Sequence, residues 1–220
     1  MEQPTETNSL EVRWFDSGSP PQELVEWITD LGPVDTTTRM DLYCAPVDPA
    51  SNLKLRGGDG EYVELKRRLG GPDRYEFGPD VTGSVEQWYK WSFPLDHTPS
   101  LWTDDPTGLW LPVEKTRTLA VLDSTDHPSV DDGVSDLSVT THVEVTEVRA
   151  LSETAWTCGL EAAGPPEHLE DALSAVGSAV FGDAFPIGLS AKQSVGYAGW
   201  IQGLTADSGP SEAVLVPSNR

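Results

Sequence analysis

Basic residues are scarce in this 220-residue chain, which has 14 Lys and Arg against 36 Asp and Glu and a formal net charge of −22. A protein that binds the DNA or RNA backbone in general needs a net basic surface, so this balance argues against such a partner. It argues equally against an anionic membrane surface. No apolar run approaches the ~20 residues of a membrane-spanning helix, and the first residues lack the basic and apolar segments of a secretory signal. We therefore expect neither DNA nor a membrane as a partner.

Cysteine is nearly absent as well, with Cys44 and Cys158 the only two. Their spacing excludes the paired motifs of a zinc site, and two thiols in a chain of this length are typical of a reduced cytoplasmic protein. Lys and Ile are also rare, with five and three residues. Together with the acidity, this composition resembles that of proteins from halophilic archaea, where salt shortens the range of charge repulsion to about 3 Å at 1 M.

The hydrophobic pattern predicts one domain over residues 9–204, between a flexible segment 1–8 and a loose tail 205–220. Alternating apolar and polar residues predict strands, and helical spacing marks helices near the start and at the end of the domain. We expect glycine-rich turns at 57–60 and 70–73 to bound one strand of a hairpin. The expected strands are 10–15, 38–45, 52–56, 62–68, 87–93, 111–122, 139–149 and 154–163, and the expected helices are 20–31, 167–181 and 190–204. The predicted fold is α+β, an eight-stranded antiparallel closed β-barrel with flanking helices, because closure removes unpaired strand edges.

The few basic residues are concentrated on these strands. Those on candidate strands are Arg13, Lys54, Arg56, Lys66, Arg68, Lys90, Lys115 and Arg117. Six of them form three pairs two residues apart, and residues with that spacing face the same side of a strand. Any one pair is typical of a solvent-exposed face. If the strands close with these faces inward, however, the lumen is cationic and requires an anionic ligand or interleaved carboxylates.

Three glutamates, Glu11, Glu144 and Glu161, lie on strand faces that could share this lumen. Cations mixed with a few carboxylates suit a small polyphosphate bound together with a divalent metal. Lys and Arg hold phosphate oxygens, and carboxylate oxygens hold Mg²⁺ or Mn²⁺. A single glutamate of this kind is more often a solvated strand residue or a salt-bridge partner. A lumen whose charges only pair with one another therefore stays a third interpretation.

In order and spacing, these residues resemble the CYTH superfamily of triphosphate tunnel enzymes over about residues 9–204. The similar segments are 10–15, 41–43, 53–56, 64–68, 114–117, the strands that carry Glu144 and Glu161, and 190–197. The resemblance implies a tunnel that binds triphosphate groups and hydrolyses triphosphates, or cyclises ATP, with Mg²⁺ or Mn²⁺. It implies metal binding by Glu11, Glu144 and Glu161, catalytic roles for Glu144 and Glu161, and phosphate binding by the basic residues.

The opening motif departs from the family pattern Glu-x-Glu-x-Lys, because the chain has Arg13 in place of the second acid and Phe15 in place of the lysine. This change is expected to weaken metal binding and to leave anion binding intact or stronger. Two functions therefore stay open. One is metal-dependent hydrolysis of a small triphosphate or organic polyphosphate, with a carboxylate holding the attacking water. The other is non-catalytic binding of a phosphorylated ligand in the same tunnel, and the sequence also leaves open whether the chain forms a homodimer.

Overall fold

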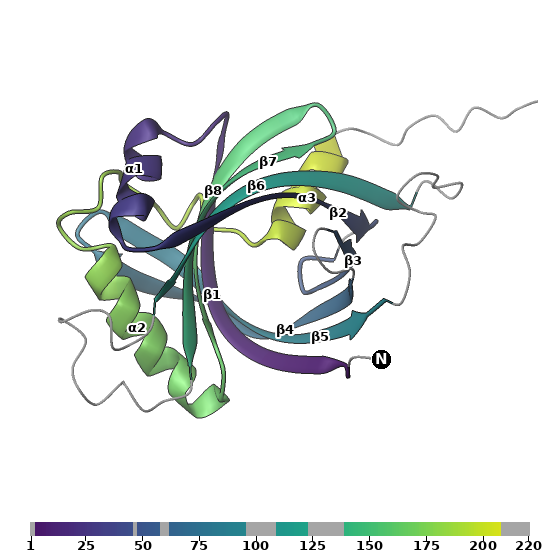
Figure 1. Ribbon diagram of the computed structural model, residues 1–220, viewed down its shortest axis with the longest axis horizontal. Helices are drawn as coiled ribbons and strands as arrows, with labels where there is room; N and C mark the ends of the chain where they lie inside the picture. Colours follow the sequence, from purple (N-terminus) through teal and green to yellow (C-terminus); the bar gives the residue numbers. More distant parts are fainter. Residues whose placement is uncertain (1–2, 46–47, 58–61, 96–108, 123–138, 208–220) are drawn as a thin grey trace, which may run out of the picture.

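The computed structural model describes residues 3–45, 48–57, 62–95, 109–122 and 139–207. In this part of the chain, eight antiparallel strands close into a barrel in the order β1-β5-β4-β3-β2-β6-β7-β8 (Figure 1). The strands are β1 (Thr5–Ser17), β2 (Val34–Cys44), β3 (Ser51–Arg56), β4 (Tyr62–Gly78), β5 (Val81–Pro94), β6 (Trp110–Leu122), β7 (Thr140–Ala150) and β8 (Glu153–Ala163). The helices are α1 (Gln22–Asp30), α2 (Leu169–Val180), preceded by the 3₁₀ turn η2 (Pro166–His168), and α3 (Tyr197–Asp207). This confirms the predicted α+β barrel with flanking helices.

The two faces of each strand have different environments, as β7 illustrates. Val143 and Val145 are buried in the main hydrophobic core, outside the barrel wall. Glu144 and Thr146 alternate with them and face the lumen, where the Thr146 hydroxyl donates to Glu144 at 3.3 Å. Because neighbouring strands pair in register, each strand contributes an alternate row of side chains to the lumen.

Helices α1 and α2 cover the outer face of one part of the barrel (Figure 1). Their buried side chains, among them Leu24 and Leu173, pack on outward residues of the strands. Beneath them β5 places Gly83 against Trp14, whose ring takes the space that a side chain at position 83 would need. A Cβ at Gly83 would lie 2.4 Å from Val12 Cγ2 and 2.6 Å from Trp14 Cζ2. The core is therefore closely packed on this side of the wall.

Helix α3 lies at one end of the barrel, where the inward positions of the strands become apolar. Phe15, Val113 and Val148 occupy inward positions of β1, β6 and β7 at this end. Ile201 of α3 packs against Val113, and Trp200 packs against Phe15 and Val148. The helix therefore fills this end of the lumen with apolar side chains.

Three expected boundaries are wrong. Strand β1 begins at Thr5, which pairs with Ser92, five residues before the expected start of this strand at residue 10. Strand β4 continues through residues 70–73, because shifts in its register with β5 accommodate the glycines and proline without ending the ladder. Helix α3 begins at Tyr197 and not at 190, and it continues to Asp207. The rest of the expected tail, residues 208–220, lies outside the described residues.

Within the described ranges, no helix combines the length and apolar character that crossing a membrane requires.

Candidate functional site

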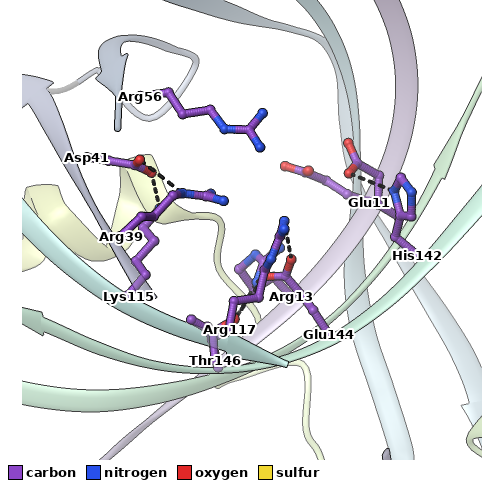
Figure 2. Close-up of polar contacts among 12 residues, drawn as sticks. Glu11, Arg13, Arg39, Asp41, Arg56, Lys115, Arg117, His142, Glu144 and Thr146 are labelled. Atoms are coloured by element: carbon purple, nitrogen blue, oxygen red, sulfur yellow. Dashed lines mark hydrogen bonds and ion pairs between the residues drawn. The ribbon is translucent and has the colours of Figure 1, made fainter. Parts of the chain in front are cut away.

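A cavity of about 130 Å³ lies in the lumen and is lined by charged side chains from all eight strands and by Tyr197 and Ala198 of α3. The charged lining residues are Glu11, Arg13, Arg39, Lys54, Arg56, Glu64, Lys66, Lys90, Lys115, Arg117, Glu144 and Glu161. Eight of the chain's 14 basic residues thus line this cavity with four carboxylates, inside a protein of net charge −22. The guanidinium groups of Arg13, Arg39 and Arg56 point into the same space (Figure 2).

The structure brings together seven of the eight basic residues that the sequence singled out for phosphate binding, and all three glutamates. The exception is Arg68, which faces the same side of β4 but is absent from the cavity lining. Its Nη1 pairs with Glu86 Oε1 at 2.5 Å, so its charge is neutralised locally.

Arg13 and Glu144 form the ion pair at the centre of one wall. Arg13 Nη1 lies 2.5 Å from Glu144 Oε1 and donates to Thr157 Oγ1 at 3.3 Å. Arg117 Nη1 lies 4.0 Å from the other carboxylate oxygen of Glu144. Burial by itself raises the pKa of Glu144, but the charges of Arg13 and Arg117 outweigh it, so the net shift is downward. Glu144 is therefore held as a carboxylate.

A second cluster surrounds Asp41, whose side chain is fully buried. Lys115 Nζ lies 2.9 Å from Asp41 Oδ2, Arg39 Nε donates to Oδ1 at 3.1 Å, and Lys54 Nζ lies 3.7 Å from Oδ2. Lys115 also donates to the Tyr43 hydroxyl at 2.9 Å. Burial lowers the pKa of Lys115 to about 7, and Lys54 and Arg39 add to this effect against the opposing charge of Asp41. A buried acid here neutralises only part of the charge of three cations.

The remaining glutamates of the lumen are also paired. Glu11 Oε2 lies 2.5 Å from Lys66 Nζ, and Glu161 Oε1 lies 3.9 Å from the same nitrogen. On its other side, Glu161 Oε2 lies 3.8 Å from His142 Nδ1. Glu64 Oε2 lies 2.9 Å from Lys54 Nζ.

Other donors in the lumen have no partner. Among the described residues, no carboxylate lies within 4.0 Å of Lys90 Nζ, and burial lowers the pKa of this lysine. Arg117 Nε and Thr37 Oγ1 are buried without a hydrogen-bond partner, and these two residues are cross-strand neighbours on β6 and β2. All three line a second, wider cavity of about 670 Å³ that shares Arg39 and Arg56 with the first. Unsatisfied buried donors are costly, so they mark where an anion would be stabilised.

Arg39, Asp41 and Glu64 were not selected as site residues from the sequence. Arg39 lies two residues from Asp41, the same spacing from a carboxylate that Arg13 has from Glu11. The alternation Arg39-x-Asp41-x-Tyr43 on one strand face was the signal available, because all three side chains meet in the Asp41 cluster.

The residues present do not fit the divalent ion that the resemblance implied. Within the parts of the chain that the structure describes, no three His, Cys, Asp or Glu side chains are grouped so that they could hold a metal ion. Glu11 and Glu144 face the same lumen, but their nearest partners are the cations Lys66 and Arg13. Mg²⁺ and Mn²⁺ require several free oxygen ligands around one point. Here Glu11 and Glu161 share the cation Lys66, and Glu144 pairs with Arg13.

No protein-family model and no curated protein matches the sequence. Several solved structures are similar in fold. The PH1819 protein of Pyrococcus horikoshii OT3 has 10% sequence identity and a TM-score of 0.47, over 90% of this chain and 99% of that one. The mimivirus capping enzyme triphosphatase has 12% identity and a TM-score of 0.42, over 79% and 89%. The S. pombe Pct1 RNA triphosphatase, solved in complex with the Spt5 CTD, has 14% identity and a TM-score of 0.38, over 76% and 73%.

Proposed function

We propose that this chain is a triphosphate tunnel protein of the CYTH type, and that its lumen binds the phosphate chain of a small triphosphate or organic polyphosphate. The observation that carries the proposal is the excess of positive charge in the lumen of a protein with net charge −22. Eight basic residues and four glutamates line one cavity, and Asp41, buried beside three of these cations, is a fifth acid, which leaves an excess of three. Buried like charges are unfavourable unless an opposite charge accompanies them. A triphosphate carries roughly four negative charges, about two of them on its terminal group, and so can balance this excess.

The unpaired donors support the same ligand. The ammonium of Lys90 and the buried Nε of Arg117 have no partner among the described residues. Lys supplies a mobile point charge and Arg a planar set of donors, and both are suited to phosphate oxygens. A phosphate chain that lies along the lumen would satisfy both groups.

The test is a titration of the purified protein with tripolyphosphate in molar KCl, followed by thermal unfolding and by calorimetry. Binding to the folded state alone stabilises it by about 2.7 kcal/mol at a ligand concentration of 100 Kd, so the midpoint temperature Tm is expected to rise. Lys66→Met should reduce this rise, because it removes a lumenal cation. The matched control is Lys192→Met, at an exposed lysine outside the barrel strands. If neither tripolyphosphate nor any other polyanion shifts Tm, the proposed function is wrong.

Hydrolysis of the bound triphosphate is the second candidate function. Glu161 favours it, because this carboxylate lies in the cavity wall, 3.9 Å from Lys66 and 3.8 Å from His142. A carboxylate in this position could orient a water molecule and accept its proton. Phosphate release is measured with Mn²⁺, with Mg²⁺ and with EDTA. Glu161→Gln should abolish release and preserve binding, whereas no release by the wild-type protein in any condition leaves binding alone as the function.

The acidic composition supports a further proposal, that the protein works in concentrated salt, as in a halophilic archaeon. The many carboxylates of a protein with this net charge repel one another, and salt screens the repulsion. Stability that increases with KCl concentration would support this habitat.

A further inference from the structure

Arg13 occupies a space that the opposite strand leaves open for it. Its Cα partner on β8 is Gly159. A Cβ at Gly159 would lie 3.0 Å from Cζ and from both terminal nitrogens of the Arg13 guanidinium. This is closer than ordinary van der Waals contact, so any larger residue at this position would crowd the guanidinium.

Three further groups fix the position of this guanidinium. Glu144 and Thr157 accept hydrogen bonds from Nη1, at 2.5 Å and 3.3 Å. The guanidinium also stacks on the ring of Tyr197, with Arg13 Cζ 4.7 Å from the ring centroid. Nε and Nη2 have no hydrogen-bond partner among the described residues, while Arg13 lines the lumenal cavity. One side of the group is therefore anchored, and the other side is available to a ligand.

Arg13 stands among the glutamates that were expected to bind a metal. Glu11 lies two residues away on the same face of β1, Glu144 is bonded to the guanidinium, and Glu161 is the Cα partner of Glu11. Burial by itself lowers the pKa of Arg13, but Glu144 and Glu11 outweigh it and raise the pKa above its ordinary value, so the group stays charged. A divalent ion here would meet a fixed positive charge and would have to displace it from Glu144.

We propose that the Arg13 guanidinium is a built-in cation of the lumen, which allows a triphosphate chain to bind without a divalent metal ion. The proposal rests on the proposed binding of a phosphate chain. The cation is part of the covalent structure and cannot be removed by a chelator, and its free donors face the ligand. Glu144 then serves to hold the guanidinium in position.

The experiment measures the Kd of tripolyphosphate for the full chain by calorimetry in molar KCl, once with EDTA and once with Mn²⁺, and measures Mn²⁺ binding to the protein alone by electron paramagnetic resonance. We expect tight binding in EDTA, no gain in affinity from Mn²⁺, which tripolyphosphate itself chelates, and no Mn²⁺ bound by the wild-type protein alone. Arg13→Gln should weaken binding in EDTA roughly 10- to 100-fold, because it removes charged hydrogen bonds. The matched control is Arg149→Gln, the same change at an arginine whose side chain is 58% exposed on β7, and its affinity should be unchanged.

Gly159→Ala provides a second variant that keeps every charge and displaces the guanidinium alone. It should weaken binding in EDTA, and it keeps the proposal testable if Arg13→Gln does not fold. The proposal is overturned if the wild-type protein needs Mn²⁺ for tight binding, or if both variants bind tripolyphosphate in EDTA as tightly as the wild type. If the wild type binds no tripolyphosphate with or without Mn²⁺, the proposed function itself fails. These results are therefore distinguishable.

Discussion

Raising the pH from 7 to 9 is expected to weaken tripolyphosphate binding through Lys115. This lysine lies at the α3 end of the cavity, where its Nζ is 3.6 Å from the centroid of the Tyr197 ring and 2.9 Å from Asp41 Oδ2. Burial lowers its pKa to about 7, helped by two neighbouring cations, Lys54 and Arg39. A phosphate chain bound beside Lys115 favours the charged form, so binding at a pH above 7 must be accompanied by uptake of a proton.

The size of the effect follows from the two pKa values of Lys115. With a pKa of about 7 in the empty site, about 0.9 of the side chain is neutral at pH 8, so binding takes up roughly 0.9 proton. If the bound ligand restores the ordinary pKa of 10.5, Kd increases about 50-fold between pH 7 and pH 9. Asp41 does not titrate in this range, because the neighbouring cations overcome its burial and lower its pKa. Lys90, whose pKa burial also lowers, acts in the same direction as Lys115.

The stability of the empty protein should change in the opposite direction. The folded-state pKa of Lys115 lies below its ordinary unfolded value, so between pH 7 and pH 9 the unfolded state binds more protons than the folded state. The Lys115 contribution to the free energy of unfolding therefore increases with pH over this range. The same pH change that weakens the complex is expected to stabilise the empty barrel.

The assay is calorimetry at pH 8 in two buffers with different enthalpies of ionisation, combined with Kd measurements from pH 7 to pH 9. Proton uptake appears as a difference in the observed heat between the buffers. Lys115→Met should reduce the difference and make the pH profile shallower, and Lys192→Met, at an exposed position, should keep both unchanged. Tripolyphosphate has two terminal phosphates and itself exchanges protons in this pH range, so the Lys115 contribution is taken as the difference between the wild type and Lys115→Met, which bind the same ligand. A wild-type heat that is the same in both buffers, with a constant Kd, would refute the reasoning.

Three other perturbations test the charge distribution and the packing. Lys90→Met should raise Tm in the empty protein, because it removes a partly buried ammonium with no carboxylate within 4.0 Å among the described residues, and weaken tripolyphosphate binding roughly tenfold; a lower Tm would contradict this. Gly83→Ala should lower the free energy of unfolding in denaturant titrations by about 1–3 kcal/mol, since its Cβ would overlap Val12 and Trp14. Gly203→Ala, with no atom within 4 Å of the added Cβ, should not lower it. Raising the KCl concentration shortens the Debye length from about 10 Å at 0.1 M to about 3 Å at 1 M. It should raise Tm of the empty protein and weaken tripolyphosphate binding. If stability and affinity both increase, or both decrease, this prediction is wrong.

The alternation of residue types was sufficient to predict the barrel and most of its charged lining. Residues two apart in a strand face the same side in any sheet, as with Lys54 and Arg56 or Lys115 and Arg117. The closed barrel then converts a shared face into a shared lumen. Seven of the eight basic residues singled out from the sequence accordingly line one cavity.

The pairing of those charges could not be predicted, because it depends on contacts between distant strands. Arg13 and Glu144 are separated by 131 positions in the sequence. Glu11 and Glu144 were expected to hold a metal together, but β4 brings Lys66 to one of them and β1 brings Arg13 to the other. Spacing along a strand shows which face a carboxylate occupies, and only the tertiary structure shows which cation it meets.

The place of α3 has a consequence for traffic into and out of the protein. Among the described residues, Trp200 and Ile201 close one end of the lumen with apolar side chains. A ligand bound as proposed would therefore enter and leave through the other end. A long polymer could not pass through a barrel closed at one end, and only its terminus could enter the lumen. The group that travels deepest is the last to leave.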